Sequence, residues 1–189
     1  MDNTTHTKNI MEYETVALDD ENNALVILDQ TKLPALTELV NLHTAQEIWD
    51  SIYLLKVRGA PAIGVAAAFG IYLLAKGINT QDHDTFYQEF CRQKDYLNSA
   101  RPTAVNLSWA LKRMGQVCVD NKGLPVSEIK HKLKEEAIAM KEEDIRVCKA
   151  IGEHGLTLVK PGDGILTHCN AGQLATCKYG TATAPIYLG

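Results

Sequence analysis

The 189-residue sequence has little that would place it in a membrane or on nucleic acid. Its longest apolar run, residues 62–75, is too short to span a bilayer and contains Gly64 and Gly70. The 19 basic and 23 acidic residues give a net charge of −4, so a broad basic field for nucleic acid is lacking. The polar N-terminus, MDNTTHTKNI, has no apolar core of a secretory signal. We therefore expect a globular cytoplasmic protein with neither membrane nor nucleic acid as a partner.

Motifs for metals and nucleotides are also missing. The five cysteines form no C-x-x-C pair, and no pair of histidines has the spacing of zinc ligands. There is no G-x-G-x-x-G and no Gly-Lys-Ser/Thr phosphate loop. The sequence thus offers no positive case for a metal or a nucleotide cofactor, and we expect none.

The periodicity of apolar residues predicts a small β-element followed by helices. Residues 13–30 alternate around a polar turn, which predicts an antiparallel hairpin. Thr44 with Glu47 has the pattern of a capping box that starts a helix. Pro61 suits the first turn of a second helix, which is apolar nearly all round and should be buried at the centre. Further amphipathic helices are predicted over 84–98, from Pro102, and from a Ser127 cap to about residue 153.

The pattern changes after a turn cluster at residues 160–164. Residues 165–169 have the pattern of a short buried strand, and 173–186 that of the helix after it, which is the opening of a parallel α/β unit. A single strand cannot make a sheet. We therefore expect an α+β protein with a mainly helical domain over 1–158 and an incomplete second domain over 159–189.

Two segments have the ingredients of an anion site. Arg58, Gly59 and Ala60 come directly before Pro61, so a guanidinium and accessible backbone N–H groups meet at a helix start. Arg101 before Pro102 repeats the arrangement. Each segment alone also fits a helix-linking turn with a surface arginine, but two guanidinium groups suit one phosphate dianion well.

Cys169 is the candidate nucleophilic or catalytic group. The expected strand ends at it and a helix follows, which is where open α/β sheets bind ligands and where a thiolate is favoured. An inert buried cysteine is the alternative. His168 is adjacent along the strand and should point to the opposite face, so a Cys169–His168 dyad is not expected.

Together VRGAPAIG, RPTAVNL and LTHCNAGQLAT with YGTA resemble the methylthioribose-1-phosphate isomerase family, sugar-phosphate isomerases similar to initiation factor 2B. The resemblance runs from about residue 13 to the end and covers the front portion of family members nearly twice as long. It implies that the second domain is Rossmann-like. It also implies that Arg58, Gly59, Ala60 and Arg101 bind substrate, chiefly its phosphate, and that Cys169 is the active-site cysteine.

The resemblance implies isomerisation of the aldose 5-methylthioribose 1-phosphate to the ketose 5-methylthioribulose 1-phosphate in methionine salvage. An enediol and a hydride route both remain open. The family's catalytic Asp is expected beyond Gly189, so we expect this chain to be an inactive N-terminal fragment of a protein that is a homodimer at full length. Two alternatives are an isomerase of 5-deoxyribose 1-phosphate or ribose 1,5-bisphosphate, and a non-catalytic regulatory protein of the same architecture.

Overall fold

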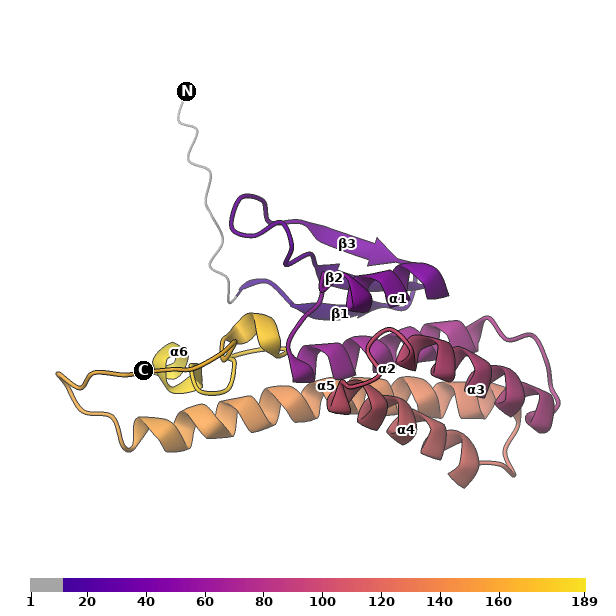
Figure 1. Cartoon of the computed structure of the whole chain (residues 1–189). Coiled ribbons are helices and arrows are strands. Elements are labelled where there is room, and N and C mark those ends of the chain that lie inside the picture. Colours follow the sequence, from indigo (N-terminus) through magenta and orange to yellow (C-terminus); the bar gives the residue numbers. More distant parts are fainter. Residues whose placement is uncertain (1–11) are drawn as a thin grey trace.

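The structure is a computed structural model and describes residues 12–189 (Figure 1). A small antiparallel sheet and five helices of nine residues or more precede a C-terminal segment with two short helices. The elements in chain order are β1 (Val16–Asp19), β2 (Ala24–Leu28), β3 (Leu39–Leu42), α1 (Ala45–Tyr53), α2 (Ala60–Lys76), α3 (His83–Asn98), α4 (Val105–Asp120), α5 (Val126–Leu156), the 3-10 helix η2 (Gln173–Ala175) and α6 (Ala184–Leu188).

The predicted hairpin is present and carries a third strand that the sequence pattern did not predict. β1 pairs with β2 so that Val16 faces Ile27, and β2 pairs with β3 so that Leu25 faces Leu42, both antiparallel. The tight turn between β1 and β2 places Asn23 in the left-handed region, which asparagine tolerates better than most residues. The α+β class is therefore confirmed in its coarse form.

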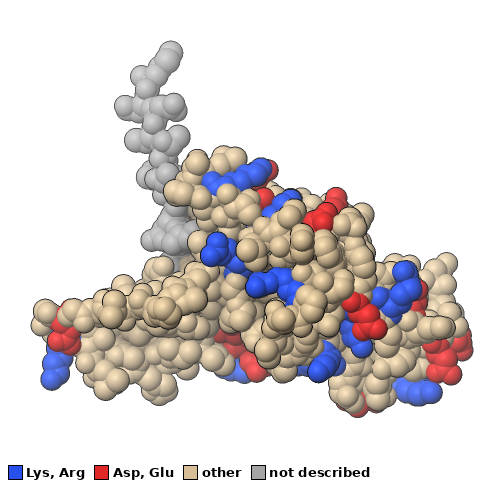
Figure 2. All heavy atoms as spheres, in the orientation of Figure 1, with Lys and Arg blue, Asp and Glu red and all other residues tan. Residues whose placement is uncertain are grey.

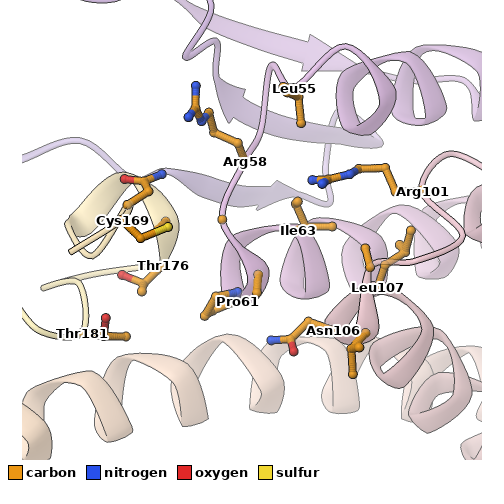
Figure 3. Close-up of a pocket in the computed structure, with 16 residues that line it drawn as sticks. Leu55, Arg58, Pro61, Ile63, Arg101, Asn106, Leu107, Cys169, Thr176 and Thr181 are labelled. Atoms are coloured by element: carbon orange, nitrogen blue, oxygen red, sulfur yellow. The ribbon is translucent and has the colours of Figure 1, made fainter.

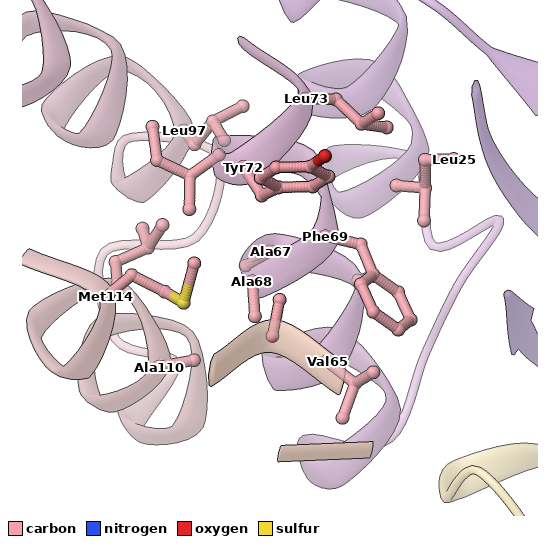
Figure 4. Packing of buried hydrophobic residues seen from close by; sticks show 14 of the residues in the cluster. Leu25, Val65, Ala67, Ala68, Phe69, Tyr72, Leu73, Leu97, Ala110 and Met114 are labelled. Carbon is pink, nitrogen blue, oxygen red and sulfur yellow. The ribbon is translucent and has the colours of Figure 1, made fainter. Parts of the chain in front are cut away.

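Helix α2 is the centre of the core, as its uniformly apolar sequence predicts. It lies between the sheet on one side and α4 and α5 on the other (Figures 1 and 4). Small residues let neighbours approach closely. A Cβ added at Gly70 would lie 2.9 Å from Cγ2 of Ile48, and one at Gly64 would lie 3.3 Å from the carbonyl oxygen of Asn106. This close packing holds the start of α4 against the start of α2.

Of three helix starts predicted from capping residues and prolines, one is confirmed and two differ in the structure. The capping box at α1 is confirmed, with the Thr44 side chain accepting from the N–H of Glu47. Pro102 does not open α4, because a turn from Arg101 to Ala104 intervenes and the helix starts at Val105. The long helix α5 starts at Val126 after Pro125, so the predicted Ser127 cap is wrong.

The C-terminal segment differs from its prediction. Residues 165–169 are exposed and form no strand with any described residue, and Leu166 is 97% exposed. The predicted helix over 173–186 is only the short η2 and α6, with turns between them. A strand needs a neighbour to take up its backbone hydrogen bonds, and none of the residues 12–189 provides one here. The segment folds back along α5 instead, where a Cβ added at Gly152 would meet Leu188 at 2.5 Å.

Candidate functional site

A pocket of about 480 Å³ lies where the α1–α2 link, the start of α4 and the C-terminal segment meet (Figure 3). All five residues proposed from the sequence line it: Arg58, Gly59, Ala60, Arg101 and Cys169. They come from three segments separated by more than forty residues each time, so the fold, and not the chain, brings them together.

Arg58 stands at the entrance to α2. Val57 before it is fully buried, which anchors the link, while Arg58 itself is exposed. Gly59 follows with φ at 96° and is the residue before the first turn of α2. No side chain caps this helix start, so its N–H groups and the positive end of its dipole are available to an anion.

Arg101 is presented in a similar way at α4. Its carbonyl accepts from the N–H of Ala104 at 2.9 Å, and this turn leads into a helix whose start also has no side-chain cap. Figure 3 shows its side chain extending from the α4 side toward Ile63. Within residues 12–189, neither Arg101 nor Arg58 has an ion-pair partner. The pocket therefore has two uncompensated cations and two uncapped helix starts.

Cys169 is the only exposed cysteine among the residues that the structure describes. It lies in the left-handed region with φ at 65°, a conformation that costs energy for a residue with a Cβ and that recurs at functional sites. The expected strand before it is absent, yet the residue still lies in the pocket wall. His168 is exposed and does not line the pocket.

Two of the buried thiols, Cys148 and Cys177, lie close to Asp144 and differ from Cys169 in character. The carboxylate of Asp144 accepts from the N–H of Cys177 at 2.7 Å and contacts the thiol of Cys148 at 3.8 Å. Burial raises the pKa of Asp144. Burial, together with the neighbouring Asp144, also raises the pKa of the Cys148 thiol to about 12 and that of Cys177 higher still. These thiols are therefore protonated and structural.

Sequence reasoning missed the groups that depend on packing. Asn106, Thr176 and Thr181 line the pocket as polar side chains. The wall that carries Thr176 is anchored by Gln30, which donates to the carbonyl of Leu174 at 2.7 Å. Asn106 stands within the RPTAVNL segment and could have been proposed from its place in the first turn of α4. The Gln30 contact joins residues 144 positions apart and leaves no local signal.

The described residues offer no metal site and no membrane span. No group of three or more His, Cys, Asp or Glu side chains gathers among them in a way that could hold a metal ion. None of the helices within residues 12–189 is both long enough and apolar enough to cross a membrane. Figure 2 shows acidic and basic side chains interspersed on the face in view, with a largely uncharged surface around the C-terminal segment.

Comparison with known proteins identifies the family. The chain belongs to the Initiation factor 2 subunit family (IF-2B), whose model matches residues 56–185. Among individual proteins, the chain is 57% identical over 176 residues to the methylthioribose-1-phosphate isomerase of Symbiobacterium thermophilum. The aligned region covers 93% of this chain and 49% of that relative. It is 55% identical over 170 residues to the 5-deoxyribose 1-phosphate isomerase of Clostridium botulinum strain Kyoto, an alignment that covers 90% of this chain and 49% of that relative.

Two solved structures share the fold. The 5-methylthioribose 1-phosphate isomerase from Pyrococcus horikoshii matches with a TM-score of 0.86 and 35% identity, over 93% of this chain and 48% of that one. The translation initiation factor eIF-2B, subunit delta, from A. fulgidus matches with a TM-score of 0.81 and 38% identity, over 92% of this chain and 50% of that one. The chain thus spans about half the length of the relatives it matches.

Proposed function

We propose that this chain forms the phosphate-binding part of an aldose–ketose isomerase that converts 5-methylthioribose 1-phosphate to 5-methylthioribulose 1-phosphate in methionine salvage. The observation that carries the proposal is the pocket in which Arg58 and Arg101, without ion-pair partners among residues 12–189, face the same space as the exposed Cys169. The relatives named as sugar 1-phosphate isomerases support it.

In this proposal Arg58 and Arg101 hold the phosphate. Guanidinium groups match a phosphate dianion in charge and in the geometry of their donors. The N–H groups at the starts of α2 and α4 add donors and favourable dipoles at the same place. Gly59 and Ala60 leave the backbone accessible to the ligand.

Cys169 then lies beside the reacting carbons. The sugar must open its ring and move hydrogen between C1 and C2, which requires a general acid and base. No Asp, Glu or His lines the pocket among the described residues. We propose that the acid–base group comes from polypeptide outside this chain. In this proposal residues 159–189 begin a Rossmann-like domain that follows the mainly helical domain over residues 1–158. The complete enzyme would then be a cytoplasmic homodimer. The chain alone should then bind substrate without turning it over.

Two other functions have a specific observation in their favour. The relative from C. botulinum is named a 5-deoxyribose 1-phosphate isomerase, and that substrate carries the same phosphate. The subunit from A. fulgidus shares the fold at 38% identity, so a role in a non-catalytic assembly is the second alternative. The unpaired arginines and exposed thiol favour a sugar phosphate site over a scaffold.

Isothermal calorimetry of the chain with 5-methylthioribose 1-phosphate tests the proposal. Losing a charge-assisted hydrogen bond costs about 1.5–3 kcal/mol, so Arg58→Ala and Arg101→Ala should each weaken binding roughly tenfold or more. Arg92→Ala is the matched control, since Arg92 pairs with Glu89 on the surface of α3 and does not line the pocket. An unaltered heat of binding in both pocket variants, or no binding at all, would refute the proposal. Turnover by the chain alone would refute the outside acid–base group.

A further inference from the structure

Gln30 contacts two sides of the pocket without lining it. It lies just after β2 and is only 9% exposed. Its backbone N–H donates to the carbonyl of Lys56 at 2.8 Å, and its side-chain Nε2 donates to the carbonyl of Leu174 at 2.7 Å. One buried residue thus joins the α1–α2 link to the C-terminal segment, which are far apart in the chain.

On the side of the link, Gln30 holds the backbone close to Arg58. The acceptor, Lys56, comes two residues before Arg58 in the sequence. Val57, the residue between them, is fully buried and donates its own N–H to the carbonyl of Ser51 at 3.2 Å. The backbone is therefore held at consecutive residues, and the point from which Arg58 extends into the pocket is fixed.

On the side of the C-terminal segment, Gln30 holds the backbone close to Thr176. The acceptor carbonyl lies two residues before Thr176, and the residue between, Ala175, is buried and packs directly against the backbone of Gly59. Thr176 and Cys169 both line the pocket, and Figure 3 shows their side chains on the same side of the α1–α2 link. The Gln30 amide is thus bonded to the wall that presents the thiol.

A hydrogen bond at this place fixes the two sides more precisely than apolar packing does. Apolar contacts have no direction, so packed surfaces can slide past one another at little cost. A bond from an amide to a carbonyl weakens as soon as its length or angle changes. Burying an amide also costs free energy unless it is bonded, a cost that an apolar side chain avoids. The chemistry of Gln30 therefore suits the setting of a distance better than the filling of space.

We infer that Gln30 is a positioning residue, which sets the separation between Arg58 and the wall that carries Cys169. A sugar 1-phosphate held by its phosphate then reaches the thiol with its reacting carbons. The inference rests on the proposed function, because that separation matters only if one ligand touches both sides of the pocket. Gln30 itself touches no ligand and acts through the carbonyls of Lys56 and Leu174.

Gln30→Met in the intact chain separates the two contacts. Methionine is similar in length but has no donor, so the bond to Leu174 is lost while the backbone N–H still reaches Lys56. Calorimetry measures 5-methylthioribose 1-phosphate, which touches both sides, and inorganic phosphate, which needs only the arginines. The sugar phosphate should bind roughly threefold to tenfold more weakly than to the wild type, and inorganic phosphate should bind equally well.

Labelling of Cys169 by iodoacetamide supplies a measurement that a loss of stability alone would not change. In the wild type, bound 5-methylthioribose 1-phosphate lies beside the thiol and should slow its labelling. In Gln30→Met this slowing should be lost, even at a ligand concentration that calorimetry shows to be saturating. Saturation removes any effect of affinity, so the comparison reports where the sugar lies relative to the thiol.

Lys130→Met is the matched control. The ammonium of Lys130 donates to the carbonyls of Lys76 and Ile78 at 3.1 and 2.7 Å, at the end of α2 away from the pocket. The variant thus removes a side-chain donor from backbone carbonyls by the same substitution. It should lower stability to urea but change neither ligand binding nor labelling. If Gln30→Met does not fold, Gln30→Asn replaces it, because its shorter side chain keeps the amide but loses the reach.

The outcomes separate the two proposals. If binding depends on the two arginines but the Gln30 variant keeps the wild-type affinities, or keeps the slowing of Cys169 labelling at saturation, the positioning role is wrong and the proposed function stands. The same holds if the variant weakens both ligands equally, or if Lys130→Met reproduces its effects, since Gln30 then acts on stability alone. If no sugar 1-phosphate binds, or if binding is indifferent to Arg58→Ala and Arg101→Ala, the proposed function fails and the positioning role fails with it.

Discussion

The backbone of Gly59 lies directly against Ala175. A Cβ added at residue 59 would lie 2.3 Å from Cα of Ala175 and 2.5 Å from its Cβ, distances that real side chains do not reach. The contact joins the start of α2 to η2, which is 116 residues further along the chain and belongs to the opposite wall of the pocket. The shape of the pocket therefore depends on a residue without a side chain at this point.

We predict that Gly59→Ala destabilises the chain by about 3 kcal/mol. The positive φ of 96° costs an alanine about 1–2 kcal/mol, and the collision with Ala175 adds the cost of moving η2. Gly162→Ala is the control, because Gly162 has a similar φ of 92° but nothing within 4 Å of an added Cβ. Urea denaturation measures both variants. Equal losses would mean that only the backbone conformation matters and that the contact with Ala175 yields easily.

Cys169 should be the first thiol to react with iodoacetamide at pH 8. It is exposed, whereas Cys118 and Cys148 are buried and burial raises the pKa of each to about 12, which lowers their thiolate fraction about a thousandfold relative to an ordinary thiol. Mass spectrometry of tryptic peptides locates the label, with Cys169→Ser as control. Bound 5-methylthioribose 1-phosphate should slow the reaction. Labelling of the half-buried Cys91 before Cys169 would contradict the exposure described here.

Asp20 links the β1–β2 turn to two helices. Its carboxylate accepts from the hydroxyl of Tyr72 and the ammonium of Lys76, both at 2.7 Å and both on α2, and from Lys134 of α5 at 2.8 Å. Partial burial alone would raise the pKa of Asp20, but the hydrogen bonds from Lys134, Lys76 and Tyr72 hold it well below its ordinary value. The folded state therefore binds a proton at Asp20 less readily than the unfolded chain does.

We predict that Asp20→Asn lowers the free energy of unfolding by about 1–2 kcal/mol at pH 7, a figure already reduced for screening by solvent. Because the folded pKa is depressed, the stabilisation is fully present above the ordinary value of 3.8 and is lost gradually as the pH falls from there to the folded pKa, which lies well below 3.8. The difference between variant and wild type should thus begin to shrink below about pH 5 and go on shrinking as the pH falls past 3. Thermal unfolding against pH measures it, with Glu21→Gln at the neighbouring exposed position as control. A difference that is the same at pH 2.5 as at pH 7 would contradict the assignment.

Features set by neighbouring residues could be predicted from the sequence. The capping box at Thr44, the hairpin and the apolar faces of the long helices each depend on residues a few positions apart. The arginine-plus-helix-start pattern also led to Arg58 and Arg101, which line one pocket, although their roles stay predictions. Here a local chemical pattern was informative because the helix start itself presents the binding groups.

Features set by distant partners could not be predicted. β3 is a four-residue strand that exists because β2 pairs with it, and its own pattern is mostly exposed. The strand expected over 165–169 failed for the converse reason, since its apolar residues meet no partner strand among residues 12–189. Asn106 lines the site because α2 packs against α4, and Thr176 does so beside a segment that Gln30, just after β2, holds through the carbonyl of Leu174.

The segment over 164–168 should be the first cleavage site for thermolysin within residues 12–189. It is fully on the surface, contains the apolar Ile165 and Leu166 that thermolysin prefers, and has no regular secondary structure to hold it away from a protease. Brief digestion followed by mass spectrometry should show a cut before Ile165 or Leu166, and Leu166→Asp should slow it. Leu158→Asp, at a similarly exposed residue just after α5, is the control that should not. Initial cleavage inside α5 would show that this helix, and not the segment after it, is the weakest part of the described fold.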